Sequence, residues 1–353
     1  MAFFLRSEKN GGDLGMIRQN SKQRATISAV AEDAGVSRAA VSKVLRNAYG
    51  VSEALRQKVE ASIERLDYRP SVAARGMRGK TYSFGVLLGG IENPFLSDVV
   101  RGISAVAEKS GYKVVMAMGR FKNALESGLI ESMIDLRLDG VILIAPRLPD
   151  KLLDQYAQQI PMVVIGHHQP SAETFDTINC DDATGAELAV NALAERGYED
   201  IAMISMPQPD VNDANIVTMR EAGYAAAMQS LGLGHHARII YMPLEQDDRT
   251  QLIKKLVSDE ARPRAIFCWS DLDAVPLLDA LRSSKVNVPS ELALIGYDNS
   301  PVTRLSLFDL STVDQLGEEQ GKASADSLLS RIGGRNKAEH TVLKPKLVLR
   351  SSH

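Results

Sequence analysis

Cysteine and long apolar runs are scarce in this chain, and each shortage excludes a class of protein. The two cysteines among 353 residues, Cys180 and Cys268, cannot supply a disulfide framework. We therefore expect packed thiols and a reducing, cytoplasmic setting. No apolar run approaches the roughly 18–20 residues that span a bilayer. The first residues, MAFFLRSEKNGGDLGM, hold only a four-residue apolar patch before a polar, glycine-rich stretch, which does not predict a secretory signal.

Sequence motifs of enzymes are also lacking. The chain has no GxGxxG dinucleotide fingerprint and no GxSxG nucleophile motif. Residues 79–81 read GKT, but Ala74 stands where a phosphate-binding loop needs its earlier glycine, and no strand precedes it. The histidine pairs 167–168 and 235–236 have no Cys or His partners at metal-ligand spacing. We therefore expect no enzymatic activity, no cofactor and no metal.

Charge is distributed unevenly along the chain. Residues 22–80 contain 12 Lys and Arg against 6 Asp and Glu, whereas residues 81–353 contain 26 against 36. A basic head that precedes an acidic body indicates that only the head meets a polyanion.

The stretch from Thr26 to Asn47, TISAVAEDAGVSRAAVSKVLRN, predicts two short helices around a tight turn. Thr26 and Ser37 are candidate N-caps, and Gly35 stands where a helix end favours positive φ. In the second helix the predicted buried stripe consists of Val41, Val44 and Leu45.

The opposite face of that second helix is small, polar and basic. It presents Arg38, Ala39, Ser42, Lys43 and Arg46. A slim helix with cationic donors can enter the major groove of DNA and reach guanine acceptors and phosphates. An ordinary helical hairpin with solvated charges is the alternative interpretation.

A third helix and a basic connector follow. Ser52 predicts the start of a helix over about 53–66. Pro70 ends it, and residues 68–82, YRPSVAARGMRGKTY, form a connector. It is either a solvated linker or a short helix that orders on DNA and enters the minor groove.

From Tyr82 onward, apolar strands alternate with amphipathic helices, which predicts an α/β fold with two doubly wound parallel units. The predicted strands are 84–90, 112–118, 140–145, 161–166, 201–206, 237–242, 264–269 and 292–297, and the predicted helices include 93–111, 184–197, 216–231, 247–259 and 273–284. Ligands of such sheets bind beyond the carboxyl ends of the strands.

These features resemble the lactose/galactose repressor family of bacterial transcription regulators over about residues 24–350. The motifs that carry the resemblance are AGVSRAAVSKVLRN, YRPSVAARGM, ENPF, MREAGY, SD at 270–271 and IGYDNS. The resemblance implies a three-helix helix-turn-helix head, a hinge, and a core of periplasmic-binding-protein-like type I architecture. It also implies a homodimeric repressor that binds a near-palindromic operator and responds to a small effector.

By that resemblance, Arg38, Ala39 and Lys43 are the base-reading candidates, while Ser37 and Ser42 contact phosphate. The hinge wedge corresponds to Met77, beside Gly76. The complete set of implied DNA-binding residues is Thr26, Ser37, Arg38, Ala39, Ser42, Lys43, Arg46, Ser71, Ala74, Arg75 and Met77.

Arg220 and Asp298 match the family's positions that hold ligand hydroxyls, since a guanidinium donates while a carboxylate accepts. An ion pair within the fold is the alternative for Arg220, and a loop cap for Asp298. Trp269 is either a stacking platform or part of the core. The other candidate effector-binding residues are Asn93, Phe95, Ile144, Pro146, His167, Asn179, Ser270 and Gln315.

The expected effector is a sugar, a polyol or a sugar acid, with a purine or nucleobase as the alternative. A sugar-binding protein without DNA function would lack the basic head. The expected domains are a disordered extension over 1–23 with the natural start at Met16, a head over 24–70, a hinge over 71–81 and a core over 82–353. Within the core, one subdomain covers about 82–178 and 315–341, and the other about 179–314 and 342–350.

Overall fold

The computed structural model describes residues 25–45, 48–69, 79–207 and 215–353. It divides into two compact units, Met1–Ala74 and Arg75–His353, which are described separately. The expected disordered extension, the start at Met16 and most of the 71–81 hinge lie outside the described residues.

The first unit is a three-helix head with its own small core. Its helices are α1 (Ile27–Asp33), α2 (Arg38–Leu45) and α3 (Glu53–Arg65), as predicted. The hydroxyls of Thr26, Ser37 and Ser52 accept hydrogen bonds from first-turn amides at 3.1–3.3 Å, which confirms the three predicted caps. Gly35 adopts a φ of 60° after α1, as its position predicted. The head core contains Val30, Ala31, Ala34, Val41, Val44, Val59 and Tyr68.

The predicted burial of Leu45 is wrong, because its side chain is 37% exposed. Val41 and Val44 fill the stripe that faces α1 and α3, and both are at most 5% exposed. Leu45 is the last helical residue and lies about 100° further round the helix than Val44, at the margin of that stripe.

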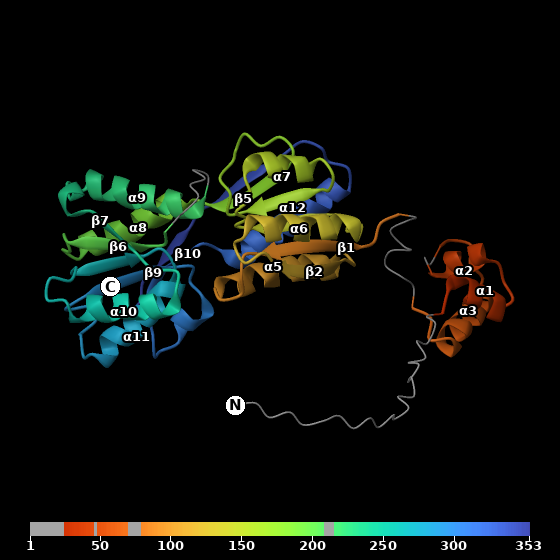
Figure 1. The fold of residues 1–353 in the computed structure, drawn as a ribbon, viewed down its shortest axis with the longest axis horizontal. Helices are drawn as coiled ribbons and strands as arrows, with labels where there is room; N and C mark the ends of the chain where they lie inside the picture. Colours follow the sequence, from red (N-terminus) through yellow and green to blue (C-terminus); the bar gives the residue numbers. More distant parts are fainter. Residues whose placement is uncertain (1–24, 46–47, 70–78, 208–214) are drawn as a thin grey trace, which may run out of the picture. The chain divides into compact units, whose positions relative to one another are not determined.

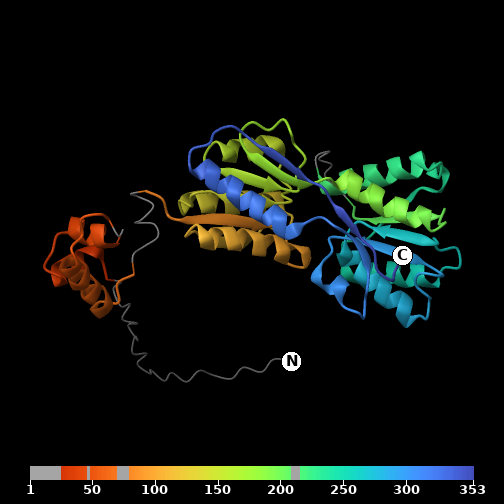
Figure 2. The same ribbon diagram turned by 180° about the vertical axis from the view of Figure 1, so that it is seen from behind.

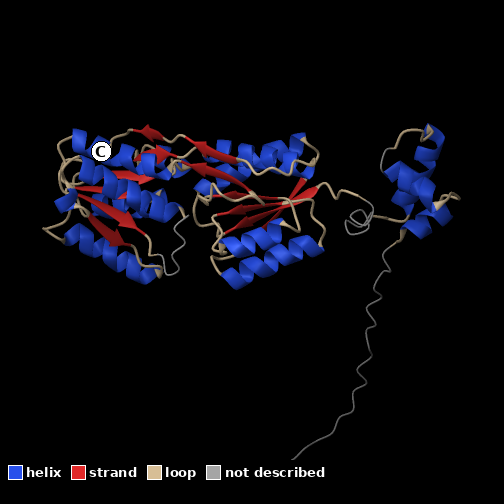
Figure 3. Ribbon diagram, turned by 90° about the horizontal axis from the view of Figure 1, so that it is seen from above, coloured by secondary structure: helices blue, strands red, loops and turns tan. Residues whose placement is uncertain are grey.

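The second unit contains two six-stranded sheets, each with helices on both faces (Figures 1 and 3). We call each sheet and its helices a lobe. In spatial order the first sheet consists of β11 (His340–Leu343), β5 (Asp176–Cys180), β4 (Met162–Ile165), β3 (Val141–Ile144), β1 (Ser83–Leu88) and β2 (Lys113–Met118), all parallel. Helices α5 (Phe95–Lys109) and α12 (Gly317–Ile332) pack on one face, and α6 (Asn123–Asp135) and α7 (Asp150–Ala157) on the other.

The second lobe repeats this three-layer arrangement. Its sheet consists of β12 (Lys346–Val348), β10 (Ser311–Asp314), β9 (Ala293–Tyr297), β8 (Ala265–Cys268), β6 (Ile201–Ser205) and β7 (Arg238–Tyr241). Helices α8 (Asp182–Glu195) and α9 (Ile216–Ser230) cover one face, and α10 (Gln246–Ser258) and α11 (Asp271–Ser283) the other. Two short 3₁₀ turns, η1 (Gly234–His236) and η2 (Pro301–Arg304), complete the lobe. The predicted fold class, two doubly wound α/β units after a helical head, is confirmed.

The chain passes between the lobes three times: between β5 and β6, between β10 and α12, and between β11 and β12. The last passage is visible in Figure 2, where the blue carboxyl-terminal segment runs from one sheet to the other. Strand β12 pairs with β10 in the antiparallel direction, which departs from the predicted parallel arrangement.

The beginning of β1 is fixed to the first lobe by one carboxylate. Asp139 accepts hydrogen bonds from the Thr81 amide at 2.8 Å, the Thr81 hydroxyl at 2.9 Å and the Tyr82 amide at 2.8 Å. Thr81 and Tyr82, the two residues before β1, are therefore anchored to the first lobe.

Two glycines allow α5 and α12 to approach closely. A Cβ on Gly321 would overlap the carbonyl oxygen of Val99, and one on Gly102 would overlap that of Glu318. Both obstacles are backbone atoms, so a side chain could be accommodated only if the helices moved apart.

We expect Gly321→Ala to lower the stability of the second unit by about 1–3 kcal/mol, because overpacking forces backbone shifts. Urea unfolding followed by circular dichroism would measure this. Gly128→Ala on α6 is the matched control, since beyond the neighbouring backbone of its own helix no atom lies within 4 Å of its added Cβ. This control should stabilise the second unit slightly, because alanine is more favourable than glycine inside a helix by roughly 0.5–1 kcal/mol. Equal effects of the two substitutions would contradict the close-packing argument.

Candidate functional site

The predicted DNA-reading face lies on α2 of the head. Arg38, Ala39 and Lys43 are exposed there, and Ser42 is half-buried. The face is free of acidic side chains over Arg38–Leu45, so its formal charge is positive. Arg46 and the hinge candidates Ser71, Ala74, Arg75 and Met77 lie outside the described residues.

Thr26 and Ser37 have local roles in addition to their predicted contact with DNA. Each hydroxyl accepts a hydrogen bond from an amide of its own helix, from Ala29 and Ala40 respectively. A capping hydroxyl keeps its proton for donation, so it can still bond to a phosphate oxygen. Both side chains are exposed, as such a contact requires.

A second site lies in the second unit and is centred on the guanidinium of Arg220 in α9, which is 1% exposed. Its Nε donates to Asp182 Oδ1 at 2.8 Å, and its Nη1 donates to the Trp269 carbonyl at 2.6 Å. Its Nη2 lies 3.4 Å from Gln315 Oε1, and its plane stacks on the Tyr297 ring at 3.6 Å. Toward the residues that the structure describes, it thus uses three of its five N–H groups.

Asp298 is the acceptor at the centre of the same site. Its Oδ2 accepts from Ser270 Oγ at 2.9 Å and from Asn93 Nδ2 at 3.1 Å, and its Oδ1 accepts from Gln315 Nε2 at 2.5 Å. Arg220 Nη1 lies 3.9 Å from Asp298 Oδ1. Asp298 has a φ of 116°, a strained conformation for a residue with a side chain, and such strain concentrates at functional positions.

We call this connected set the Arg220 network. Its members are Asn93, His168, Asp182, Arg220, Trp269, Ser270, Tyr297, Asp298 and Gln315. Residues from seven separate segments meet here because the carboxyl ends of parallel strands converge on one edge of each sheet.

The network joins the two lobes. Asn93, which follows β1 in the first lobe, donates to Asp298, which follows β9 in the second. His168 Nε2 lies 2.8 Å from Asp182 Oδ2 across the same boundary. The backbone of His167 also forms an isolated antiparallel bridge with Asn215, the residue that caps α9.

Burial and charge set the ionisation of the network. Burial raises the pKa of Asp298 and of its neighbour Asp271. Burial would also raise the pKa of Asp182, but the charge of Arg220 and the bond from His168 outweigh it, so that pKa is lowered. Burial opposes the charged form of Arg220, yet Asp182, Tyr297 and Asp298 raise its pKa. Asp182 and Arg220 are therefore held as an ion pair.

Five of the predicted effector residues have other surroundings. Phe95 and Ile144 are buried in the core of the first lobe. Pro146 is half-buried in the loop after β3. The Asn179 side chain bonds to both the amide and the carbonyl of His167 at 2.9 Å. The His167 ring lies 3.0 Å from Asp150 Oδ1 and near the Phe175 ring, and burial lowers its pKa.

The two interpretations of Trp269 are partly resolved. Its ring packs against the core of the second lobe, and its indole N–H donates to Asp273 at 2.6 Å. Its carbonyl belongs to the Arg220 network. The ion pair of Arg220 with Asp182, which was the alternative for Arg220, is present in the fold.

Asp182, Tyr297 and His168 are network members that lie outside the predicted set of effector-binding residues. Asp182 follows β5, so inspection of every strand end would have found it. Tyr297 stands in the quoted IGYDNS motif, and His168 in the histidine pair after β4. The contacts that place all three with Arg220 come from distant segments.

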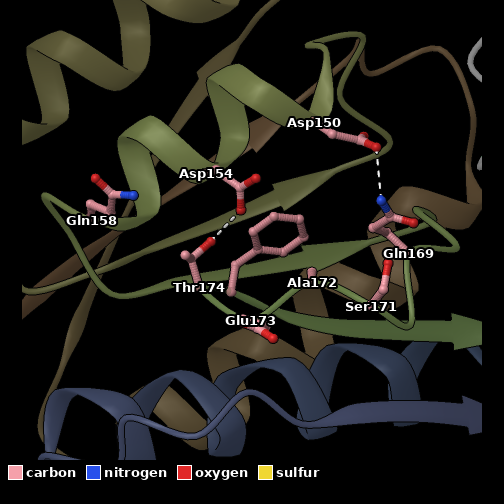
Figure 4. Close-up of a pocket in the computed structure, with 9 residues that line it drawn as sticks. Asp150, Asp154, Gln158, Gln169, Ser171, Ala172, Glu173 and Thr174 are labelled. Carbon is pink, nitrogen blue, oxygen red and sulfur yellow. Dashed lines mark hydrogen bonds between the residues drawn. The ribbon is translucent and has the colours of Figure 1, made fainter.

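A polar cavity of about 300 Å³ lies elsewhere, in the first lobe (Figure 4). It is lined by Asp150, Asp154, Gln158, Gln169, Ser171, Ala172, Glu173, Thr174 and Phe175. Thr174 donates to Asp154 and Gln169 donates to Asp150 across it. None of the predicted effector residues lines this cavity.

Cys180 and Cys268 are buried free thiols, as predicted, and burial raises the pKa of Cys180 to about 12. Within the described ranges, no group of three or more His, Cys, Asp or Glu side chains could hold a metal ion. No helix of the described chain is long and apolar enough to cross a membrane.

Comparison with known proteins identifies a matching family for the head and a matching domain for much of the second unit. Residues 26–71 match the model of bacterial regulatory proteins of the lacI family, and residues 190–353 match a periplasmic binding protein-like domain. The ribose operon repressor of Escherichia coli strain K12 is 31% identical over 312 residues, which cover 87% of this chain and 93% of that protein.

Two solved structures have the same fold. A complex of the transcriptional regulator CelR with cellobiose is 27% identical, with a TM-score of 0.66 over 94% of this chain and 100% of the other. The lac repressor dimer bound to operator and the anti-inducer ONPF has a TM-score of 0.79 at 23% identity, over 94% and 99% of the two chains.

The head, the two-lobed core and the site between the lobes define a DNA-binding transcriptional regulator with a periplasmic-binding-protein-like effector domain. The chain belongs to the lacI family of bacterial regulatory proteins. The relatives that it matches are repressors of transcription and not enzymes.

Proposed function

We propose that this repressor binds a near-palindromic operator as a homodimer and is controlled by a small polyhydroxylated effector held in the Arg220 network. The observation that carries the proposal is the pairing of a buried guanidinium with a buried carboxylate at the boundary of two lobes. A hydroxyl group both donates and accepts, so it can bond to Asp298 and Arg220 together.

The location of the network between the lobes supports control by the effector. A ligand that bonds to Asp298 competes with Asn93 of the first lobe, so its binding favours one arrangement of the lobes over another. We infer that this arrangement sets the affinity of the head for DNA. Ribose and cellobiose appear in the names of proteins similar to this chain, but the repressors PurR and CytR are also similar to it. The preference for a sugar or polyol therefore rests on the pairing of Arg220 with Asp298.

Exposed apolar side chains at two sheet edges support a dimer. Strand β2 ends the first sheet and is followed by exposed Phe121, while Met116 and Met118 on the strand are 58% and 44% exposed. Strand β7 ends the second sheet and presents Tyr241, with Leu244 beyond it. We propose that a second copy covers these edges, because large apolar patches mark interaction surfaces.

We also propose the domain limits given above, with the head over 24–70, the hinge over 71–81 and the core over 82–353. Because the partner of the head is operator DNA, we infer that the protein acts in the bacterial cytoplasm. In this arrangement the hinge candidates Ser71, Ala74, Arg75 and Met77 contact DNA together with α2.

We expect Arg38→Ala to weaken operator binding by about 1–3 kcal/mol and to relax the preference for one base pair in each half-site, because a bidentate arginine–guanine contact is worth that much. Fluorescence anisotropy at fixed salt, with a set of operator variants, would measure both the loss of affinity and the change in base preference. Lys58→Ala on α3 removes the same charge from another helix and should not change base preference. An unaltered preference for Arg38→Ala would exclude Arg38 as a base reader.

Titration with sugars and polyols tests the effector proposal itself. A member of the panel should bind the purified repressor and change its operator affinity. A ligand at 100 times its dissociation constant stabilises the protein by about 2.7 kcal/mol, which a thermal-shift screen detects. Binding of purines, with no response to any sugar or polyol, would contradict the proposal.

A further inference from the structure

The Arg220 network holds more buried negative charge than positive charge. Arg220 Nε lies 2.8 Å from Asp182 Oδ1, and Arg220 Nη1 lies 3.9 Å from Asp298 Oδ1. All three side chains are at most 1% exposed. One guanidinium therefore faces two carboxylates from which water is excluded.

The ion pair with Asp182 is the closer of the two and is supported by two further contacts of Asp182. Besides Arg220, Asp182 contacts His168 Nε2 at 2.8 Å and the Tyr297 hydroxyl at 3.4 Å. Since these contacts hold the carboxylate in place, the charge of Arg220 is largely compensated before any effector arrives.

We propose that Asp182 restricts the Arg220 network to uncharged effectors, namely neutral sugars and polyols, and excludes sugar acids and sugar phosphates. The inference rests on the proposed function of this network as the effector site. It narrows the expected effector classes by removing the anionic one.

Hydrogen-bonding capacity leads to the same conclusion as charge. A ligand carboxylate or phosphate ester dianion offers only hydrogen-bond acceptors. Asp298 is itself an acceptor, so the two groups cannot bond to each other. Placed between Arg220 and Asp298, an anion gains one partner and meets a like charge in a medium of low dielectric constant. A hydroxyl donates to Asp298 and accepts from Arg220, so it satisfies both groups.

Two cationic side chains of the surrounding elements, Arg147 and Arg249, do not neutralise the excess negative charge of the network. Arg147, after β3, has its guanidinium over the Phe121 ring at 5.6 Å. Arg249 on α10 pairs with Asp273 rather than with Asp182 or Asp298. Measurements are made at pH 8, where histidine side chains are commonly neutral.

The test compares matched neutral and acidic probes on the full-length protein. D-Glucose is paired with D-gluconate and D-glucuronate, D-ribose with D-ribonate, and D-ribose with D-ribose 5-phosphate. Isothermal titration calorimetry at pH 8 gives the dissociation constants. In every pair with measurable binding, the neutral member should bind at least tenfold more tightly.

Asp182→Asn keeps the size of the side chain and an acceptor for Arg220 while removing one negative charge. The ratio of the dissociation constant of the acid to that of its neutral partner should fall at least tenfold. Asp181→Asn is the matched control, since Asp181 caps α8 through Thr184 outside the network. That substitution should leave the ratio unchanged, and thermal unfolding verifies that both variants are folded.

The outcomes separate the inference from the function on which it rests. Wild-type protein that binds an acid as tightly as its neutral partner overturns the inference alone. So does an unchanged ratio in folded Asp182→Asn. If no sugar, polyol or acid binds, the proposed effector function fails and the inference fails with it.

Discussion

A chain shortened to residues 80–353 should lose specific operator binding and still bind its effector. The head has its own core around Val30, Val41 and Val59, and the second unit has separate cores in its two lobes. Specific binding by such regulators exceeds non-specific binding by roughly a factor of 10³–10⁷, so a loss of at least roughly 1,000-fold is expected.

The position of the cut follows from Asp139. Thr81 and Tyr82 must stay, because their amides and the Thr81 hydroxyl bond to that carboxylate. Electrophoretic mobility shift with operator DNA measures the loss, and calorimetry measures the retained effector affinity. A shortened chain that still retards operator DNA with full specificity would show that the head is not the reader.

Asp298→Asn should lose most of the effector affinity while operator binding without effector changes little. The substitution keeps the shape of the side chain but removes the charge and replaces one acceptor oxygen with a donor. Loss of one member of a buried, hydrogen-bonded charged contact costs about 2–5 kcal/mol of binding free energy. The dissociation constant of the effector should rise accordingly, as calorimetry would show.

A buried carboxylate outside the network provides the control for Asp298→Asn. Asp176 at the start of β5 is fully buried and pairs with Arg331 at 2.7 Å and with Arg335. Asp176→Asn should lower the stability of the first lobe and leave effector affinity unchanged. If both substitutions weakened effector binding equally, a general loss of stability would explain the result and Asp298 would have no specific role.

The fold was predictable where apolar periodicity is strong. The apolar strands β1, β3, β4, β6, β8 and β9 are found within one or two residues of their predicted ends. The short strands β5, β10, β11 and β12 were not predicted, because segments such as DTINC, STVD and KLV have too few apolar residues to stand out. Their place in the sheets depends on pairing with strands distant in sequence.

The candidate site was predictable where a motif marks a strand end. Asn93, Ser270 and Asp298 stand in such motifs, and Gln315 was expected at a strand end. Gln315 and Asp298 lie beside Arg220, while Asn93 and Ser270 bond to Asp298. Asp182 was missed because the predicted helix began at 184, whereas α8 begins at Asp182 and turns this side chain toward Arg220. A pair 38 positions apart in sequence has no local pattern.

If the effector binds to Asp298 as proposed, it replaces the hydrogen bond from Asn93 rather than adding a contact to it. The carboxylate that is proposed to hold the ligand is also one of the points at which the lobes are joined. The measured affinity is then the difference between two sets of contacts, so a tight fit to the second lobe alone would give only moderate binding. Natural variation at position 93 could therefore tune the sensitivity of the repressor without altering its choice of ligand.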